Sequence, residues 1–188
     1  MRPKKVEEQE LLFKLMSVLR RKGYDGSSLN VLAEKSGLQK ASLYHRFPGG
    51  KKAIADAVLD FADVWVRTNV YDVLANSAIN PEKRLKQIIK TIGDDLYDNG
   101  HEMCILRALS MDASSGLFGS KIKKSMKMWI DAFILLGVDF KFSNEIAASK
   151  ALQVIVNIQG GLVVAESLGS TKPFQEILKS IENLYIES

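Results

Sequence analysis

The sequence has little of what several protein classes require. Cys104 is the single cysteine among 188 residues, which excludes an intramolecular disulfide framework. The two histidines, His45 and His101, are too few and too far apart for a Cys/His zinc site. The chain's apolar runs are far shorter than the ~20 residues that span a bilayer, and Val6 is followed by acidic residues where a signal peptide would be apolar. We therefore expect a protein of the reducing cytoplasm, without metal, cofactor or membrane.

Proline and glycine are also scarce. The chain has four prolines and thirteen glycines, with 46% hydrophobic and 26% charged residues. This composition excludes collagen-like repeats and argues against disorder, because it supplies enough apolar surface for a core. The length allows one large domain or two small ones.

The charge is unevenly distributed along the chain. Residues 1–52 hold twelve Lys and Arg against five Asp and Glu, a balance of +7. Residues 53–188 hold fourteen against seventeen, a balance of −3. A basic head on a mildly acidic body is typical of a polyanion-binding module fused to another domain. A solvated basic surface without a partner would give the same count, so charge alone leaves both interpretations open.

Apolar residues recur at the helical period along nearly the whole chain, and sustained strand-like alternation is missing. The pattern predicts an all-α protein. Asn80 and Ser143 are expected to cap two of its helices, and a loop is expected at 113–116. The glycines expected to end helices are Gly23, Gly37, Gly137 and Gly169. About nine helices are expected, over residues 7–22, 29–36, 40–47, 51–76, 81–97, 104–112, 117 or 120 to 136, 143–168 and 173–186.

The most informative stretch is residues 28–52. Ser28 can cap a short helix, Gly37 can form a tight turn, and Ala33 and Leu43 provide small and apolar contacts where two short helices cross. This spacing is the pattern of a helix-turn-helix, whose second helix would present polar side chains to DNA. An ordinary αα-hairpin would also be served by these residues.

These motifs resemble the N-terminal signature of the TetR family of bacterial transcriptional regulators. The resemblance covers about residues 8–60, and it depends on the combined spacing rather than on one short motif. The matching residues, in order, are Ser28, Leu32-Ala33, Ser36-Gly37-Leu38, Leu43-Tyr44-His45-Arg46-Phe47 and Lys51.

The resemblance implies roles for individual residues of the head. Ser28 and Lys51 would anchor phosphates at helix N-termini, where free N–H groups and the helix dipole favour anions. Tyr44 would reach a phosphate, whereas Leu43 and Phe47 would pack inside. The residues that would face the major groove are Gln39, Lys40, Ser42 and His45.

Two departures from the family pattern stand out. Many members carry Ser or Thr at the position of Gln39, so its capping role is expected to be weaker here. The segment between Phe47 and Lys51 is one residue longer than the commonest form. That longer form resembles a branch of the family that responds to antibiotics such as lincomycin or to plant flavonoids.

The resemblance also implies the organisation of the remaining chain. Residues 1–52 would form the DNA-binding domain and residues 53–188 a helical ligand-binding and dimerisation domain. The last two helices would pair with those of a second subunit, with Gly160-Gly161 allowing close approach; alternatively, the two glycines kink a buried helix. A homodimer would place its recognition helices on a palindromic operator in double-stranded DNA.

In the family, the effector pocket lies between the long helix after the head and the middle helices. An amide within an apolar helix could orient a ligand, but it could equally face solvent or the dimer partner. Trp129 and Phe133 could also be plain core. The expected lining residues are Trp65, His101, Cys104, Trp129, Phe133, Gln153 and Asn157.

The leading hypothesis is a repressor that leaves its operator when a small, largely apolar molecule binds the body. One alternative is an enzyme that uses His101 and Cys104 as base and nucleophile, but no third orienting partner is in view. The other is an all-helical scaffold without a DNA role. We therefore expect a regulator rather than an enzyme.

Overall fold

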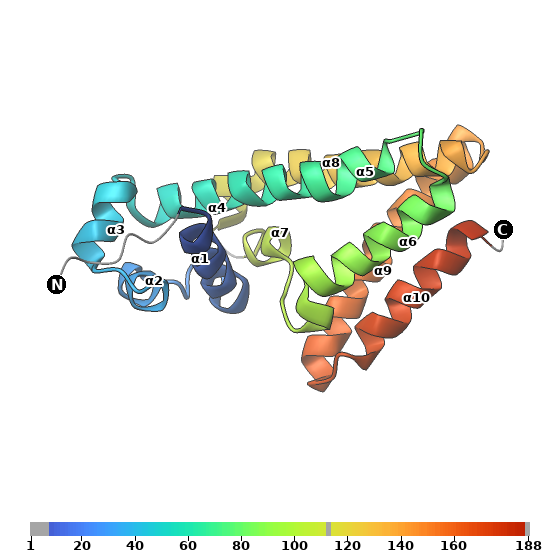
Figure 1. Ribbon diagram of the computed structural model, residues 1–188. Helices are drawn as coiled ribbons and strands as arrows, with labels where there is room; N and C mark the ends of the chain where they lie inside the picture. Colours follow the sequence, from blue (N-terminus) through green and yellow to red (C-terminus); the bar gives the residue numbers. More distant parts are fainter. Residues whose placement is uncertain (1–7, 112–113, 187–188) are drawn as a thin grey trace. The chain divides into compact units, whose positions relative to one another are not determined.

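The computed structural model describes residues 8–111 and 114–186. Helices make up 81% of the described residues, which contain no strand. The predicted all-α class is confirmed, and residues 8–111 and 114–186 hold the predicted nine helices when α4, the turn after it and α5 are taken as one. Figure 1 shows the elements in chain order.

The chain divides into two compact units. The first comprises residues 1–63 and 105–122, and the second comprises residues 64–104 and 123–188. The boundaries fall within two long helices, α4 (Gly50–Val66) and α8 (Ser114–Asp139). The predicted functional boundary after residue 52 is a different division, and it stays a prediction.

Three short helices begin the first unit. They are α1 (Glu8–Lys22), α2 (Leu29–Ser36) and α3 (Lys40–Arg46). Gly37 ends α2 in the left-handed conformation, at φ 73°, where a residue with a Cβ would be strained. Their apolar faces form a core that also includes α4 residues, with Leu11, Leu15, Leu19, Leu32, Leu43, Ile54 and Val58 fully buried.

A segment distant in sequence completes this unit. It consists of α7 (Ile105–Ala108), which packs against α1, and the first turns of α8. We predicted a loop at 113–116 and a later helix start, but α8 already begins at Ser114; residue 113 lies outside the described residues. Phe118 explains the difference, because its fully buried side chain anchors this first part of α8 in the core.

The second unit begins with the end of α4. The helix continues through a π-helical turn, η1 (Arg67–Tyr71), into α5 (Asp72–Leu74). Asn80 then caps α6 (Pro81–Thr91) as predicted, accepting hydrogen bonds from the N–H groups of Glu82 and Lys83 at 2.9 and 3.3 Å. A second π turn, η2 (Ile92–Leu96), and a 3₁₀ turn, η3 (Asp98–Gly100), follow, where one α-helix to residue 97 was expected.

The end of α8 corrects a second prediction. Gly137 does not stop the helix, which runs on to Asp139. A Cβ at Gly137 would lie 2.8 Å from the Cβ of Ala147, so this glycine allows α9 (Asn144–Leu168) to approach closely. Ser143 caps α9 and Gly169 ends it, as the sequence predicts.

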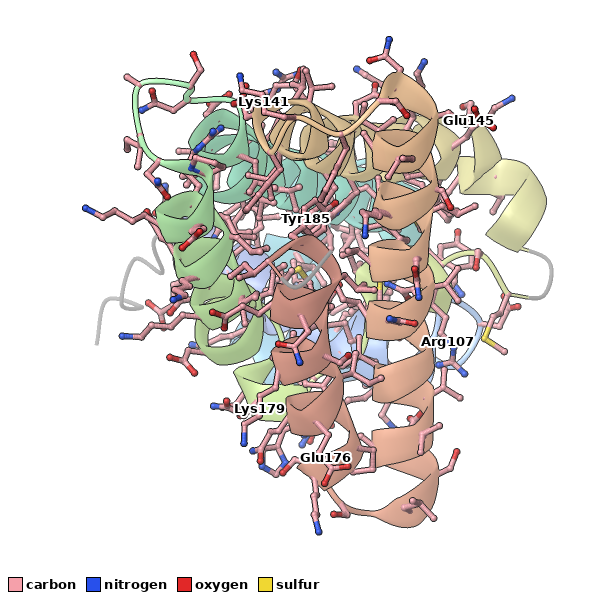
Figure 2. The ribbon with its side chains drawn as sticks, turned by 90° about the vertical axis from the view of Figure 1, so that its right-hand side faces the viewer. Arg107, Lys141, Glu145, Glu176, Lys179 and Tyr185 are labelled. Atoms are coloured by element: carbon pink, nitrogen blue, oxygen red, sulfur yellow. The ribbon has the colours of Figure 1, made fainter. Side chains whose placement is uncertain are left out.

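The last helix, α10 (Lys172–Ile186), lies alongside α9. Gly161 of α9 faces it, since a Cβ there would lie 3.2 Å from the Cγ1 of Ile177. Figure 2 shows Tyr185 near the end of α10, where its buried hydroxyl donates to the Phe133 carbonyl at 3.3 Å. Burial raises the pKa of this hydroxyl. Glu176, nearer the start of α10, is exposed.

One buried charge ties three elements of the second unit together. The side chain of Arg84 in α6 is 1% exposed, and its guanidinium donates to the Leu74 carbonyl and to the Asp139 carboxylate. The distance to Asp139 is 2.6 Å. Because a buried charge needs a partner, this arrangement fixes the end of α5, α6 and the end of α8.

Candidate nucleic-acid interface

The recognition helix α3 separates its apolar and polar residues cleanly. Leu43 is fully buried and Phe47, just after the helix, is half-buried, as expected for packing residues. Tyr44 is 45% exposed although it is a large aromatic residue. The other residues predicted to face DNA are also exposed, namely Gln39, Lys40, Ser42 and His45. All five side chains are therefore accessible to a partner.

The N-terminus of α2 matches the prediction for Ser28. Its exposed hydroxyl oxygen accepts a hydrogen bond from the N–H of Val31 at 3.3 Å and so caps the helix. Other N–H groups in the first turn of a helix lack intrahelical partners and can bind an anion. The N-cap of α3, Gln39, makes no side-chain capping hydrogen bond, in line with its departure from the family pattern.

Lys51 lies in the first turn of α4, but its ammonium has partners within the head. It donates to the carbonyl oxygen of Tyr24 at 2.9 Å, and it lies 4.1 Å from the centroid of the Tyr24 ring. Tyr24 is a residue that the sequence interpretation missed. Nothing in the local pattern could have linked it to Lys51, because the contact depends on how the loop after α1 folds against α4.

A chain of charges continues along α4. Lys52 pairs with Asp56 at 2.7 Å, and Lys121 of α8 pairs with Asp56 at 3.3 Å and with Asp60 at 2.8 Å. Burial alone would raise the pKa of Asp56, but hydrogen bonds from Lys52 and Lys121 outweigh it and lower the pKa. Both lysines therefore offset carboxylates that would otherwise weaken the positive potential of the head.

The residues proposed to line an effector pocket are scattered over the second unit. Trp129 and Phe133 come together, with buried rings stacked 6.5 Å apart. Gln153 is exposed on α9, which fits the alternative of facing solvent or a partner. Of the remaining residues, Cys104 is buried, Trp65 and Asn157 are half-buried, and His101 is exposed.

The geometry of these residues bears on the enzyme alternative. His101 lies at the surface whereas Cys104 is buried, so the two side chains occupy different environments. Within residues 8–111 and 114–186, no group of three or more His, Cys, Asp or Glu side chains is placed to hold a metal ion. What the described residues do offer is an exposed polar helix on a basic head.

The head matches a known family of proteins. Residues 14–58 match the family model described as bacterial regulatory proteins, tetR family. The predicted resemblance of the head to the TetR family is confirmed. TetR-family regulators are DNA-binding proteins that control transcription, and they are not enzymes.

Two relatives from Bacillus subtilis extend the match. The HTH-type transcriptional regulator LmrA is 30% identical over 70 residues, which cover 37% of each chain. The uncharacterized HTH-type transcriptional regulator YxaF is 22% identical over 177 residues, which cover 92% of each chain. Over nearly the whole length of the chain, sequence identity to this relative is therefore low.

Solved structures share the fold over nearly the whole chain. A TetR regulator from Legionella pneumophila has a TM-score of 0.82 and 20% identity, covering 98% of this chain and 100% of its own. A cysteine mutant of the TetR-family regulator CifR, solved with 26bp double-strand operator DNA, has a TM-score of 0.72 and 20% identity. That match covers 97% of this chain and 98% of the other, and it too establishes the TetR fold.

Proposed function

We propose that this chain is a TetR-family regulator, and that it is a cytoplasmic, homodimeric repressor that leaves a palindromic operator when a small, largely apolar molecule binds its body. The observation that carries the DNA-binding part is the exposed polar face of α3 beside a fully buried Leu43. Lys40, Ser42 and His45 can hydrogen-bond base edges or phosphates from that face. The basic head, residues 1–52, supplies affinity that does not depend on sequence.

The dimer is supported by a face of α9 that one chain leaves uncovered. Its apolar residues recur every four positions, which forms a ridge that a second helix can pack against. Leu152, Val156 and Leu168 are 54, 59 and 68% exposed, and Val164 shares their spacing. Gly160 falls in the same series, and a Cβ there would meet open space, so the backbone of a second copy could approach at this point.

The apolar character of α9 fits the same dimer. By length and composition α9 could cross a membrane, with a mean hydropathy of 1.4 in a window that is 39% buried. One such helix is ordinary in a soluble protein. An apolar face of a helix needs cover, and α10 packs against α9 at Gly161 while the ridge stays exposed. A second copy, packing through the same ridge of its own α9, supplies the missing cover symmetrically.

Dimerisation in turn supports operator reading. A lone recognition helix makes few base contacts, whereas a two-fold dimer places two of them about one duplex turn apart, ~34–36 Å, or a multiple of it. An effector that favours another separation of the two helices would weaken DNA binding by its differential affinity for the two states. In this scheme residues 1–52 bind DNA and residues 53–188 bind the effector and the partner.

The effector site is proposed for the second unit. The stacked Trp129 and Phe133 offer aromatic surface, and Trp65, Cys104 and Asn157 are the other candidates that are at least half-buried. The two π turns, η1 and η2, support this location, because π turns occur frequently at functional sites. The longer segment before Lys51 makes lincomycin and plant flavonoids the first effectors to test.

The experiment starts from a random duplex library. Rounds of selection on the purified protein should enrich a palindrome, and an electrophoretic shift should then show two protomers bound to each site. Titration of lincomycin and of a plant flavonoid should release that DNA. Failure to enrich any palindrome would overturn operator reading, and enrichment of a site without symmetry would overturn the dimer.

A further inference from the structure

The loop between α1 and α2 and the start of α4 form a corner in the head that the helix-turn-helix pattern does not account for. At this corner Tyr24 contacts Lys51 twice, through its backbone and through its ring. The carbonyl oxygen takes one N–H of the ammonium at 2.9 Å, and the ring centroid lies 4.1 Å from the Nζ atom. Tyr24 therefore restrains a side chain that otherwise has many rotamers.

The ring of Tyr24 is itself held in place. Phe118, in the first turns of α8, meets it edge to face, with centroids 5.3 Å apart and an interplanar angle of 71°. Phe118 is fully buried, and Lys121, one turn later, is paired with Asp56 and Asp60 of α4. A segment from the second half of the chain thus buttresses the corner from two sides.

The restrained ammonium keeps its capacity for DNA. An ammonium has three donors, and the Tyr24 carbonyl takes one of them, which leaves two for a phosphate. Attraction to the face of the aromatic ring adds to the restraint from the hydrogen bond. A preplaced lysine loses less side-chain entropy on binding than a free one does.

We propose that Tyr24 is a positioning residue for DNA binding, which holds the Lys51 ammonium ready for a backbone phosphate while Phe118 fixes the Tyr24 ring. The inference rests on the proposed function, in which Lys51 contacts a phosphate. It gives the loop after α1 and the first turns of α8 a role in DNA binding. Tyr24 itself need not touch the DNA.

The test is a double-mutant cycle on the full-length protein, with a random-sequence duplex of ~30 base pairs, about three helical turns, as the probe. The variants are Tyr24→Leu, Lys51→Ala and the double variant. Tyr24→Phe serves as the conservative variant because it keeps the ring. Tyr71→Leu is the matched control, since Tyr71 also carries a cation on its ring, Arg67 at 4.5 Å, but lies in the second unit.

Tyr24→Leu should weaken binding by about 4- to 25-fold for a dimer altered in both heads, which corresponds to about 2- to 5-fold per head. The slope of log affinity against log salt should fall toward the Lys51→Ala value. The double variant should bind no more weakly than Lys51→Ala alone. Tyr24→Phe and Tyr71→Leu should bind like the unaltered protein.

Other outcomes separate the two levels of inference. Additive losses in the double variant, or a Tyr24→Leu protein that binds normally, would overturn the positioning role alone. A Lys51→Ala protein with unchanged affinity would overturn both that role and the Lys51 assignment. Absence of binding by the unaltered protein at low salt would overturn the proposed function itself.

A measurement on the unaltered protein covers the case in which Tyr24→Leu does not fold. The ring of Tyr24 should shift the NMR signals of the Lys51 ε-protons upfield relative to those of Lys123, which lies exposed on α8. Adding the random duplex should move the Lys51 signals in a saturable way. Lys51 ε-protons at ordinary positions would show that the contact does not persist in solution and would overturn the proposal.

Discussion

The helices α3 and α9 each leave one face uncovered, and the two faces differ in chemistry. The outer face of α3 carries hydrogen-bonding side chains such as Lys40 and His45, whereas that of α9 carries Leu152 and Val156. The difference indicates different partners. A polar, basic face suits a wet, charged surface such as DNA, and an apolar ridge suits another apolar ridge.

The largest effect is expected from a charge placed in the ridge of α9. Val156→Asp enters a symmetric interface twice, and burying two carboxylates there should weaken dimerisation by roughly 1,000-fold or more. Operator affinity should then fall by ~100-fold or more, because one head retains few contacts. Analytical ultracentrifugation and fluorescence anisotropy measure the two quantities.

Ile79→Asp is the control for that change. Ile79 is 39% exposed in the loop before α6, outside the ridge, so a carboxylate there should leave the dimer intact. A dimeric Val156→Asp protein would show that the second copy packs elsewhere. The exposed apolar face of α9 would then not be the dimer interface.

The next largest effect is expected from salt, which should weaken DNA binding through α3 far more than dimerisation through α9. If the two heads together neutralise about six phosphates, DNA affinity should drop ~1,000-fold between ~50 and ~200 mM salt. Dimerisation through apolar side chains should change little over the same range. Parallel titrations of DNA binding and of dimer dissociation measure both. A dimer as salt-sensitive as the DNA complex would contradict an apolar interface.

A single side chain of α3 should have a smaller effect. Lys40→Ala removes an exposed donor from the recognition helix and should weaken operator binding by about 10-fold, or ~1.4 kcal/mol. The control is Lys179→Ala on α10, which removes another exposed lysine, from the second unit (Figure 2). Equal losses of affinity in the two variants would mean that only net charge matters. Lys40 of α3 would then make no specific contact with the operator.

The smallest effect comes from a matched pair of helix caps. Ser28 and Ser143 each accept an N–H three residues ahead at 3.3 Å. Replacing either serine with alanine should lower the free energy of unfolding by ~1 kcal/mol. Ser28→Ala should also weaken DNA binding a few-fold, because its helix N-terminus is proposed to meet a phosphate. Thermal unfolding measures the loss of stability in each variant. If both variants lose equal stability and also bind DNA with equal affinity, Ser28 makes no phosphate contact.

Local signals explain which parts of the fold could be predicted. The N-caps at Ser28, Asn80 and Ser143 and the C-cap at Gly37 act within a few residues, so α2 and the starts of α6 and α9 were placed correctly. Gly137 carries the same local signal as a stop, yet the close approach of Ala147 keeps it inside α8. That contact is tertiary and leaves no mark in the neighbouring sequence.

The candidate site divides in the same way. The exposed residues of α3 could be predicted because Leu43 fixes which side of a short helix is buried. The contact of Lys51 with Tyr24, and the support of Tyr24 by Phe118, join segments far apart in the chain. The ion pair of the buried Arg84 with the half-buried Asp139 was missed for the same reason, since either residue alone resembles an ordinary surface charge in the sequence.

The π turns at Arg67–Tyr71 and Ile92–Leu96 have a consequence for how the gene can vary in length. A π turn closes hydrogen bonds five residues apart where an α turn closes them four apart, so it holds one residue more. Deleting one residue within either turn would restore regular α-helix, and the surplus residue would be lost without breaking the helix. A deletion elsewhere in an α-helix would turn all following residues by about 100° about the helix axis, whereas a deletion within a π turn removes the surplus residue and largely avoids that rotation.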